Sequence, residues 1–277
     1  MHAHKNASHR APIGMFDSGL GGLTVANALM RRLPSESLLY FGDTARVPYG
    51  PKSPETVRRY ALQIGDWLVQ EGVKCIVVAC NTATAHALEA LQSSLPVPVI
   101  GVVEPGARAA VRASRVGPIG VIGTSGTIGS GAYVRAIQQQ SPSARVLSAP
   151  CPLFVPLVEE GWVDHPATRL IAHDYLSPMR EAQVDTLVLG CTHYPLLASV
   201  IAAEMGPDVR LIDSADETAA EVERILSDRG LRHDPAGEHD AGPVHRVVAS
   251  DAPQHFLTLG GRFLDVPLTA VEYHVFT

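Results

Sequence analysis

The hydrophobic positions of this chain fall in short continuous runs that alternate with longer amphipathic stretches. Continuous apolar runs bounded by turn residues are typical of strands buried on both faces of a parallel sheet. Helix-like stretches between such strands indicate the α/β class. The predicted strands are 13–16, 38–41, 75–79, 99–103, 119–122, 145–148, 186–189, 210–212 and 246–249.

The stretch 53–71 shows how the helices between these strands are recognised. Ser53 is suited to cap the first turn, and Pro54 fits the first helical position. Gly72 is suited to end the helix, because glycine readily adopts the backbone conformation that follows a last turn.

An internal repeat divides the chain into two similar halves. Residue 13 matches residue 119, an offset of 106 residues, and residue 80 matches residue 191, an offset of 111 residues. The difference of five residues between these offsets is an ordinary change in loop length. Three pairs of segments match: 13–19 with 119–125, 75–82 with 186–193, and 99–107 with 211–219.

The repeat predicts two pseudo-symmetric lobes, each a mainly parallel sheet flanked by helices, with an active site in the cleft between them. We expect a discontinuous first lobe over 11–103 plus 214–277, a second lobe over 104–213, and a disordered leader over 1–10. The polar stretch 231–242 reads as a loop. One more strand and helix follow it, and the sequence does not say where they dock.

Composition narrows the class of protein. The 277 residues are 46% hydrophobic and 18% charged, with a mean hydropathy of +0.11, as expected of a folded chain. A net charge of −6 and a pI near 6.0 lack the basic excess of nucleic-acid-binding proteins, so no nucleic-acid partner is expected. No apolar run approaches the ~20 residues of a membrane helix, and 1–10 has no export signal. We therefore expect a cytoplasmic protein without a membrane partner.

Two of the four cysteines occupy the positions where ligands bind in parallel sheets. Cys80 and Cys191 each follow an apolar run at equivalent points of the repeat. The helix N-terminus expected there favours a thiolate. A lone cysteine is more often a buried core residue, but two at matching positions favour chemistry. Cys75 and Cys151 have no such placement, and we interpret them as structural.

Other polar segments lie at the same strand ends. The turn 17–22 offers backbone amides that could hold a small carboxylate, although an ordinary glycine turn is an alternative. Segment 123–127 is its counterpart in the second half, and 43–50 is either a plain loop or a wall of the site. No Cys-x-x-Cys is present and the histidines are scattered, so no metal site is expected.

Two thiols facing each other across a cleft suggest racemisation by two bases. One group removes a proton from one face of a carbon while the other delivers a proton to the opposite face. Asn81, Thr82 and Thr192 could donate hydrogen bonds to the charge that builds on the substrate.

Pyridoxal phosphate is the common cofactor for this chemistry, and it requires a lysine. The chain has only Lys5, Lys52 and Lys74. Lys5 lies in the leader and Lys74 at the wrong end of its strand, so only Lys52 remains conceivable as the cofactor lysine. A mechanism without a cofactor is therefore expected.

Several motifs together resemble the glutamate racemase family, in the same order and over about 13–213. The motifs are 16–24 (FDSGLGGLT), 41–44 (FGDT), 48–50 (PYG), 79–84 (ACNTAT) and 189–195 (LGCTHYP).

The resemblance implies a cofactor-independent enzyme that interconverts L- and D-glutamate, supplies D-glutamate for peptidoglycan, and forms a homodimer. It also implies roles for individual residues. The catalytic residues would be Cys80, Cys191, Asp17, His193 and Glu159. The substrate-binding residues would be Asp17, Ser18, Tyr49, Gly50, Asn81, Thr82, Thr124, Thr192 and His193.

Three alternatives stay open at this point. A related racemase of aspartate or another acidic amino acid would use the same thiols, and one methylene changes binding by only about 1–3 kcal/mol. A non-catalytic two-lobed amino-acid-binding protein would leave the paired thiols without a role. A hydrolase could use Cys191 and His193, although their spacing does not establish contact.

Overall fold

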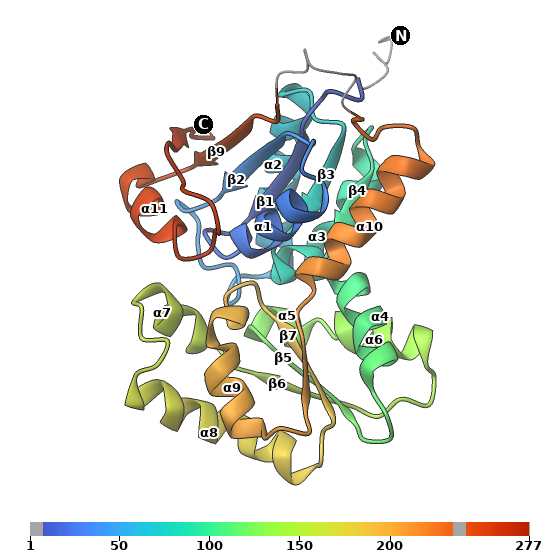
Figure 1. The fold of residues 1–277 in the computed structure, drawn as a ribbon, viewed down its shortest axis with the longest axis vertical. Coiled ribbons are helices and arrows are strands. Elements are labelled where there is room, and N and C mark those ends of the chain that lie inside the picture. Colours follow the sequence, from blue (N-terminus) through green and yellow to red (C-terminus); the bar gives the residue numbers. More distant parts are fainter. Residues whose placement is uncertain (1–7, 235–241, 277) are drawn as a thin grey trace.

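The computed structural model describes residues 8–234 and 242–276, whose strands form two parallel sheets in separate lobes (Figure 1). We call the parts built on the first and second sheets the first and second lobes. The first sheet contains β1 (Ile13–Asp17), β2 (Leu38–Gly42), β3 (Cys75–Val78), β4 (Val99–Gly101), β9 (His245–Ala249) and β10 (Glu272–Tyr273). The second sheet contains β5 (Ile119–Gly123), β6 (Val146–Pro150), β7 (Thr186–Gly190) and β8 (Arg210–Ile212).

Both sheets contain the same four-stranded arrangement, which confirms the internal repeat. The first has the order β10-β9-β2-β1-β3-β4 and the second the order β6-β5-β7-β8. Their pairing registers are also equivalent, since Ile13 lies opposite Cys75 and Ile119 lies opposite Thr186. The β2-β1-β3-β4 arrangement therefore recurs as β6-β5-β7-β8.

The predicted strands are confirmed, each with ends within two residues of the observed ones. The sequence left the docking of the last segment open. In the structure, α11 (Pro253–Gly260) follows β9, and β10 then pairs with β9 at the edge of the first sheet. Residues 8–10 form a turn before β1, residues 231–234 form no helix or strand, and the rest of the expected leader and loop (1–7 and 235–241) lies outside the described residues.

Helices cover both faces of each sheet. The helix predicted over 53–71 is confirmed: the Ser53 side chain accepts a hydrogen bond from the Thr56 amide, and Gly72 has a φ of +81°. The first lobe carries α1 (Leu23–Arg32), α2 (Pro54–Gln70) and α3 (Asn81–Ser94). The second carries α5 (Ser125–Gly129), α6 (Ala132–Gln140), α7 (Phe154–Glu159), α8 (Pro166–Glu181), the 3-10 helix η1 (Tyr194–Leu197) and α9 (Ala198–Met205).

Two further helices cross between the lobes. Helix α4 (Val103–Ala113) follows β4 of the first sheet but packs on α6 and β7 of the second lobe. Helix α10 (Ala215–Asp228) follows β8 of the second sheet but packs on α1 and β4 of the first lobe (Figure 1). These crossings support lobe boundaries at 103/104 and 213/214, which we retain as a proposal.

The hydrophobic core continues from one lobe into the other. One cluster of buried side chains includes Met15 and Val77 of the first sheet together with Leu187, Leu189 and Cys191 of the second half. Strands β1, β3 and β7 therefore contribute to one continuous core. Across the described residues, no helix is long and apolar enough to cross a membrane.

Lys74, the lysine in front of β3, is buried in an ion pair with Glu36. Its ammonium also donates to the backbone carbonyl oxygens of His9, at 2.6 Å, and Leu231, at 2.9 Å. It lies at the opposite end of β3 from Cys80, as predicted.

We expect Lys74→Met to lower the free energy of unfolding by about 3–5 kcal/mol, because it leaves the buried Glu36 carboxylate without the cation that pairs with it. Urea unfolding followed by circular dichroism measures this change. The double variant Lys74→Met/Glu36→Leu should recover much of the loss. Arg169→Ala, which breaks the exposed pair with Asp164, should change stability little. A single Lys74→Met as stable as the parent protein would contradict the expectation.

Candidate active site

Cys80 and Cys191 occupy equivalent strand ends in the two lobes. Cys80 follows β3 and is the N-cap of α3, where its sulfur accepts a hydrogen bond from the Ala83 amide at 3.4 Å. Cys191 follows β7. Strand order reverses between β1 and β3 and between β5 and β7, and ligands bind at such points in parallel sheets. Both side chains are nearly closed to solvent, at 5% and 7% exposure.

The surroundings of Cys80 favour the neutral thiol. The thiol donates a long hydrogen bond of 3.8 Å to the Ser18 hydroxyl. Burial, together with the negative charge of Asp17, raises the pKa of the Cys80 thiol to about 12. When Cys80 does lose its proton, the resulting thiolate is therefore a strong base.

Cys191 lies beside a cationic histidine. Its sulfur is 3.9 Å from His193 Nδ1, and His193 Nε2 is 3.1 Å from Glu159 Oε1. Burial lowers the pKa of His193, but hydrogen bonds to Cys191 and Glu159 outweigh this effect and bring the pKa to about 10. His193 is therefore an imidazolium at neutral pH, next to the Cys191 sulfur.

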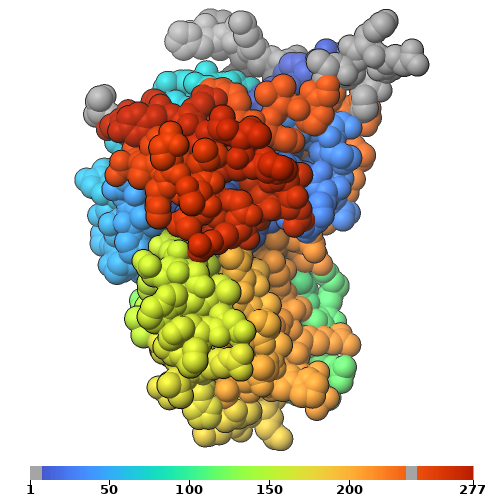
Figure 2. Space-filling view, turned by 60° about the vertical axis from the view of Figure 1, so that its left-hand side comes forward, coloured from blue at the N-terminus to red at the C-terminus, as the bar shows by residue number. Residues whose placement is uncertain are grey.

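The C-terminal segment closes over this histidine. The ring of Phe263 meets the His193 ring edge-on, with 5.8 Å between their centres. Figure 2 shows the red C-terminal segment directly above the yellow-green part of the second lobe. Residues after β9 therefore help to exclude water from the Cys191 side of the site.

Asp17 links the two lobes through a hydrogen bond from the residue that follows Cys191. The Thr192 hydroxyl donates to its Oδ1 at 3.4 Å, and the Gly19 amide donates to its Oδ2 at 2.9 Å. Burial raises the pKa of Asp17, although the His193 charge and hydrogen bonds from Gly19, Gly22 and Thr192 oppose this. The turn predicted to hold an anion with its amides thus uses two of them on its own carboxylate.

Threonine hydroxyls form a second junction between the lobes. Thr82 of α3 lies 2.8 Å from Thr124 and 3.2 Å from Thr127, measured between Oγ1 atoms. Beside them, the Gly126 amide donates to the Gly50 carbonyl at 2.9 Å. The predicted residues Thr82, Thr124 and Gly50 are therefore brought together where the lobes meet.

The Tyr49 side chain stabilises the loop 43–50, to which it belongs. Its buried hydroxyl donates to the Asp43 carboxylate, which also accepts from Arg46 and, at 2.9 Å, from the Ser250 hydroxyl. A substrate contact through this hydroxyl would require the bond to Asp43 to break. The side chain of Tyr49 holds the loop in place, and the neighbouring Gly50 reaches the lobe boundary.

The structure also reveals a residue that sequence reasoning missed. Tyr133 of α6 donates from Oη to Asn81 Oδ1 at 2.7 Å, so that it contacts the residue after Cys80 from the other lobe. No motif marks Tyr133 in the sequence. The only signal was its position shortly after the polar segment 123–127.

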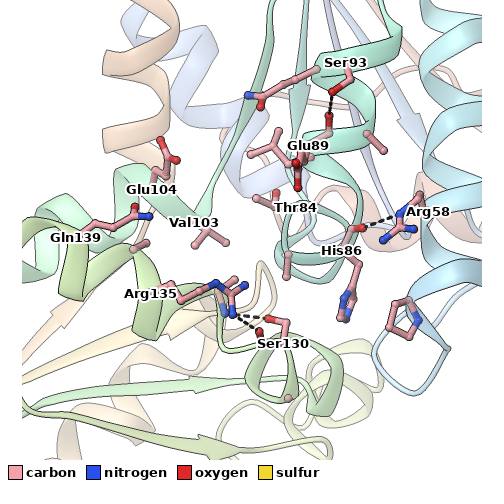
Figure 3. Close-up of a pocket in the computed structure, with 18 residues that line it drawn as sticks. Arg58, Thr84, His86, Glu89, Ser93, Val103, Glu104, Ser130, Arg135 and Gln139 are labelled. Atoms are coloured by element: carbon pink, nitrogen blue, oxygen red, sulfur yellow. Dashed lines mark hydrogen bonds between the residues drawn. The ribbon is translucent and has the colours of Figure 1, made fainter.

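A separate cavity of about 850 Å³ is lined by residues of α3, α4 and α6 (Figure 3). Figure 3 shows Arg58 and His86 on one side and Arg135 and Ser130 on another. None of the predicted site residues lines this cavity, although α3 also begins next to Cys80. The described residues contain no cluster of three or more His, Cys, Asp or Glu side chains arranged to hold a metal.

The fold and site define a class: a two-lobed α/β protein with one buried thiol at the switch point of each half. The sequence profile of the Asp/Glu/Hydantoin racemase family matches residues 23–222, and the chain belongs to this family.

Individual proteins similar to this chain are glutamate racemases. The chain is 56% identical to the glutamate racemase of Geobacter metallireducens, over 91% of this chain and 92% of that one. It is 49% identical to the glutamate racemase of Syntrophus aciditrophicus, over 97% and 98% of the two chains. Among solved structures, a Bacillus anthracis glutamate racemase isoform matches with a TM-score of 0.89 and 41% identity, over 100% of this chain and 98% of that one.

Two further structures bear on the ligand. The Francisella tularensis glutamate racemase in complex with D-glutamate matches with a TM-score of 0.88 and 36% identity, over 97% and 98% of the chains. An aspartate racemase of Picrophilus torridus matches with a TM-score of 0.54 and only 16% identity, over 79% and 94%, which shows a shared fold and no more.

We expect Glu159→Gln to lower the pKa of His193 below its value of about 10, because the variant removes the carboxylate that stabilises the imidazolium. An NMR titration of the histidine ring carbons measures the shift. Glu160→Gln, at the exposed neighbouring position, is the matched control and should leave the titration unchanged. An unaltered His193 titration in Glu159→Gln would show that this pair does not hold the charge.

Proposed function

We propose that the chain is a glutamate racemase that interconverts L- and D-glutamate without a cofactor, with Cys80 and Cys191 as the two proton-transfer groups. The observation that carries the proposal is the placement of these buried thiols at equivalent strand ends of two repeated lobes. Curated glutamate racemases 46–56% identical over nearly the whole chain support the activity.

In the proposed reaction of D-glutamate, the Cys80 thiolate removes the α-proton and becomes a thiol. The bonding electrons remain on the α-carbon and spread into the carboxylate. The Cys191 thiol then delivers its proton to the opposite face and becomes a thiolate. For L-glutamate the two cysteines exchange roles, so that one proton is removed and one is added in either direction.

The α-proton of an amino acid is only weakly acidic. Its removal therefore requires a strong base and surroundings that stabilise the charge left on the substrate. The high pKa of Cys80 supports a role as a strong base. His193 and Glu159 would support Cys191, because an imidazolium beside the sulfur offsets negative charge there. Asp17 would assist on the Cys80 side.

Hydrogen-bond donors would stabilise the charge that builds on the carboxylate as the proton leaves. The proposed substrate-binding set is Asp17, Ser18, Tyr49, Gly50, Asn81, Thr82, Thr124, Thr192 and His193. The contacts among Thr82, Thr124 and Gly50 support a binding site that both lobes share.

Three wider proposals come with this activity. D-Glutamate produced by the enzyme would enter peptidoglycan synthesis, the enzyme would act in the cytoplasm, and it would form a homodimer. Glutamate is favoured over aspartate, because the relatives that are similar over nearly the full chain are glutamate racemases.

A thiol hydrolase is the second candidate, favoured by the contacts from Cys191 to His193 and from His193 to Glu159. Such a mechanism gives no role to Cys80, which lies at the equivalent position of the repeat. Racemisation uses both thiols, and we therefore prefer it.

We expect L-glutamate incubated with the protein in heavy water to yield D-glutamate that carries solvent deuterium at the α-carbon. The reaction should end at equal amounts of the two forms, because enantiomers have the same free energy. Chiral chromatography with mass spectrometry measures both results. Hydrolysis of an amide or ester substrate without α-proton exchange would favour the second candidate.

Cys80→Ala and Cys191→Ala should each reduce the racemisation rate by at least about 100-fold, the usual contribution of a general acid or base. Cys75→Ala is the matched control, because Cys75 is equally buried but lies at the other end of β3 from Cys80. Its activity should stay close to that of the parent. Full activity in either Cys80→Ala or Cys191→Ala would exclude the two-thiol assignment.

A further inference from the structure

Tyr133 links the two lobes through a buried hydrogen bond. It lies on α6 of the second lobe with 2% of its surface exposed, and its hydroxyl donates to Asn81 Oδ1 at 2.7 Å. Asn81 is the first residue of α3 in the first lobe and directly follows Cys80. The bond therefore joins the second lobe to the start of the helix that Cys80 caps.

The ring of Tyr133 also lies against the strand end that carries the other cysteine. A Cβ on Gly190 would lie 3.1 Å from Tyr133 Cε2, and one on Gly106 would lie 3.3 Å from the Tyr133 hydroxyl. Gly190 directly precedes Cys191, and its lack of a side chain makes room for the ring. One side chain thus contacts a sequence neighbour of each cysteine.

Hydrogen bonding determines which way the Asn81 amide points. Ser214, at the start of α10, lies close to the Tyr133 hydroxyl, and both flank Gly106. The Tyr133 hydroxyl donates its proton to Asn81 Oδ1, which places Nδ2 on the other side of the amide. Asn81 is 3% exposed, and its Nδ2 has no hydrogen-bond partner among the residues that the structure describes. A buried donor without a partner is costly unless a ligand accepts its bond.

We propose that Tyr133 is a positioning residue for racemisation, which holds the Asn81 amide with Nδ2 directed at the substrate carboxylate. This inference rests on the proposed function and deepens it. Negative charge grows on that carboxylate as the α-proton leaves, so a donor held in place before the reaction stabilises the transition state. Because the hydrogen bond spans the lobes, it forms only when they are together, and it links closure of the site to orientation of the donor.

The chemistry of the hydroxyl agrees with this role. Burial, with the nearby charge of Asp213, raises the pKa of Tyr133 above its ordinary value. The hydroxyl therefore keeps its proton and remains a hydrogen-bond donor at neutral pH.

The test is Tyr133→Phe, which keeps the ring against Gly190 and removes only the hydroxyl. We expect kcat/KM for glutamate to fall about tenfold to hundredfold, mostly through kcat. Without the Tyr133 hydroxyl, the Asn81 side-chain amide can rotate, and it is less often oriented to stabilise the transition state. Both directions must lose the same factor, since the two enantiomers are equally stable. Tyr194→Phe is the matched control: Tyr194 is fully buried and donates to the Cys151 carbonyl at 2.8 Å, and its loss should leave kcat/KM near that of the parent.

A double-mutant cycle with Asn81→Ala separates positioning from a merely structural role. If Tyr133 acts through Asn81, Tyr133→Phe should cause no further loss of kcat in the Asn81→Ala background. Losses that multiply, or parental kinetics in Tyr133→Phe, would overturn the proposal while leaving the racemase activity in place. Failure of the proposed function would appear differently, as an inactive parent protein.

Should Tyr133→Phe not fold, Ser214→Ala changes a side chain that interacts with the Tyr133 hydroxyl and leaves the tyrosine intact. We expect a smaller fall in kcat that again disappears in the Asn81→Ala background. A fall that persists there would also overturn the proposal.

Discussion

The close approach of Gly21 to the second lobe is the constraint on which the site depends. A Cβ on Gly21 would lie 2.3 Å from Thr192 Oγ1 and 2.5 Å from His193 Nδ1, so only glycine permits this contact. The turn after β1 therefore lies directly against the residues that follow Cys191. Asp17, at the start of the same turn, accepts a hydrogen bond from the Thr192 hydroxyl. The end of β1, which pairs with the strand β3 that precedes Cys80, is therefore held directly against the residues that follow Cys191.

A pseudo-symmetric fold produces two thiols with different electrostatic surroundings. Cys80 lies near the carboxylate of Asp17, and burial keeps it a neutral thiol. Cys191 lies beside His193, whose charge is maintained by Glu159. Each thiol in a two-base reaction must serve as acid in one direction and base in the other. The unequal surroundings show that a repeated fold need not repeat its electrostatics. The repeat aligns Asp17 with Gly123 and His193 with Thr82, so equivalent positions carry different side chains.

Local physical chemistry made much of the fold predictable. The strands follow from continuous apolar runs, and α2 follows from the capping serine, the initial proline and the final glycine. The repeat located both cysteines at strand ends, because equivalent segments occupy equivalent places in a parallel sheet. Other features had no local signal. The edge strand β10 is two residues long, and it is set by its pairing with β9.

The sequence by itself determined the class, the repeat and the two cysteines. The class follows from local patterns of apolar and polar residues, and comparison of short segments between the two halves reveals the repeat and the matching cysteines. Only the tertiary structure decided what surrounds them. The bond from Tyr133 to Asn81 joins residues 52 apart, and that from Ser250 to Asp43 joins residues 207 apart. The exchange of α4 and α10 between the lobes likewise has no local signature. Such contacts depend on how whole lobes pack, and packing is a property of the assembled core that no single segment encodes.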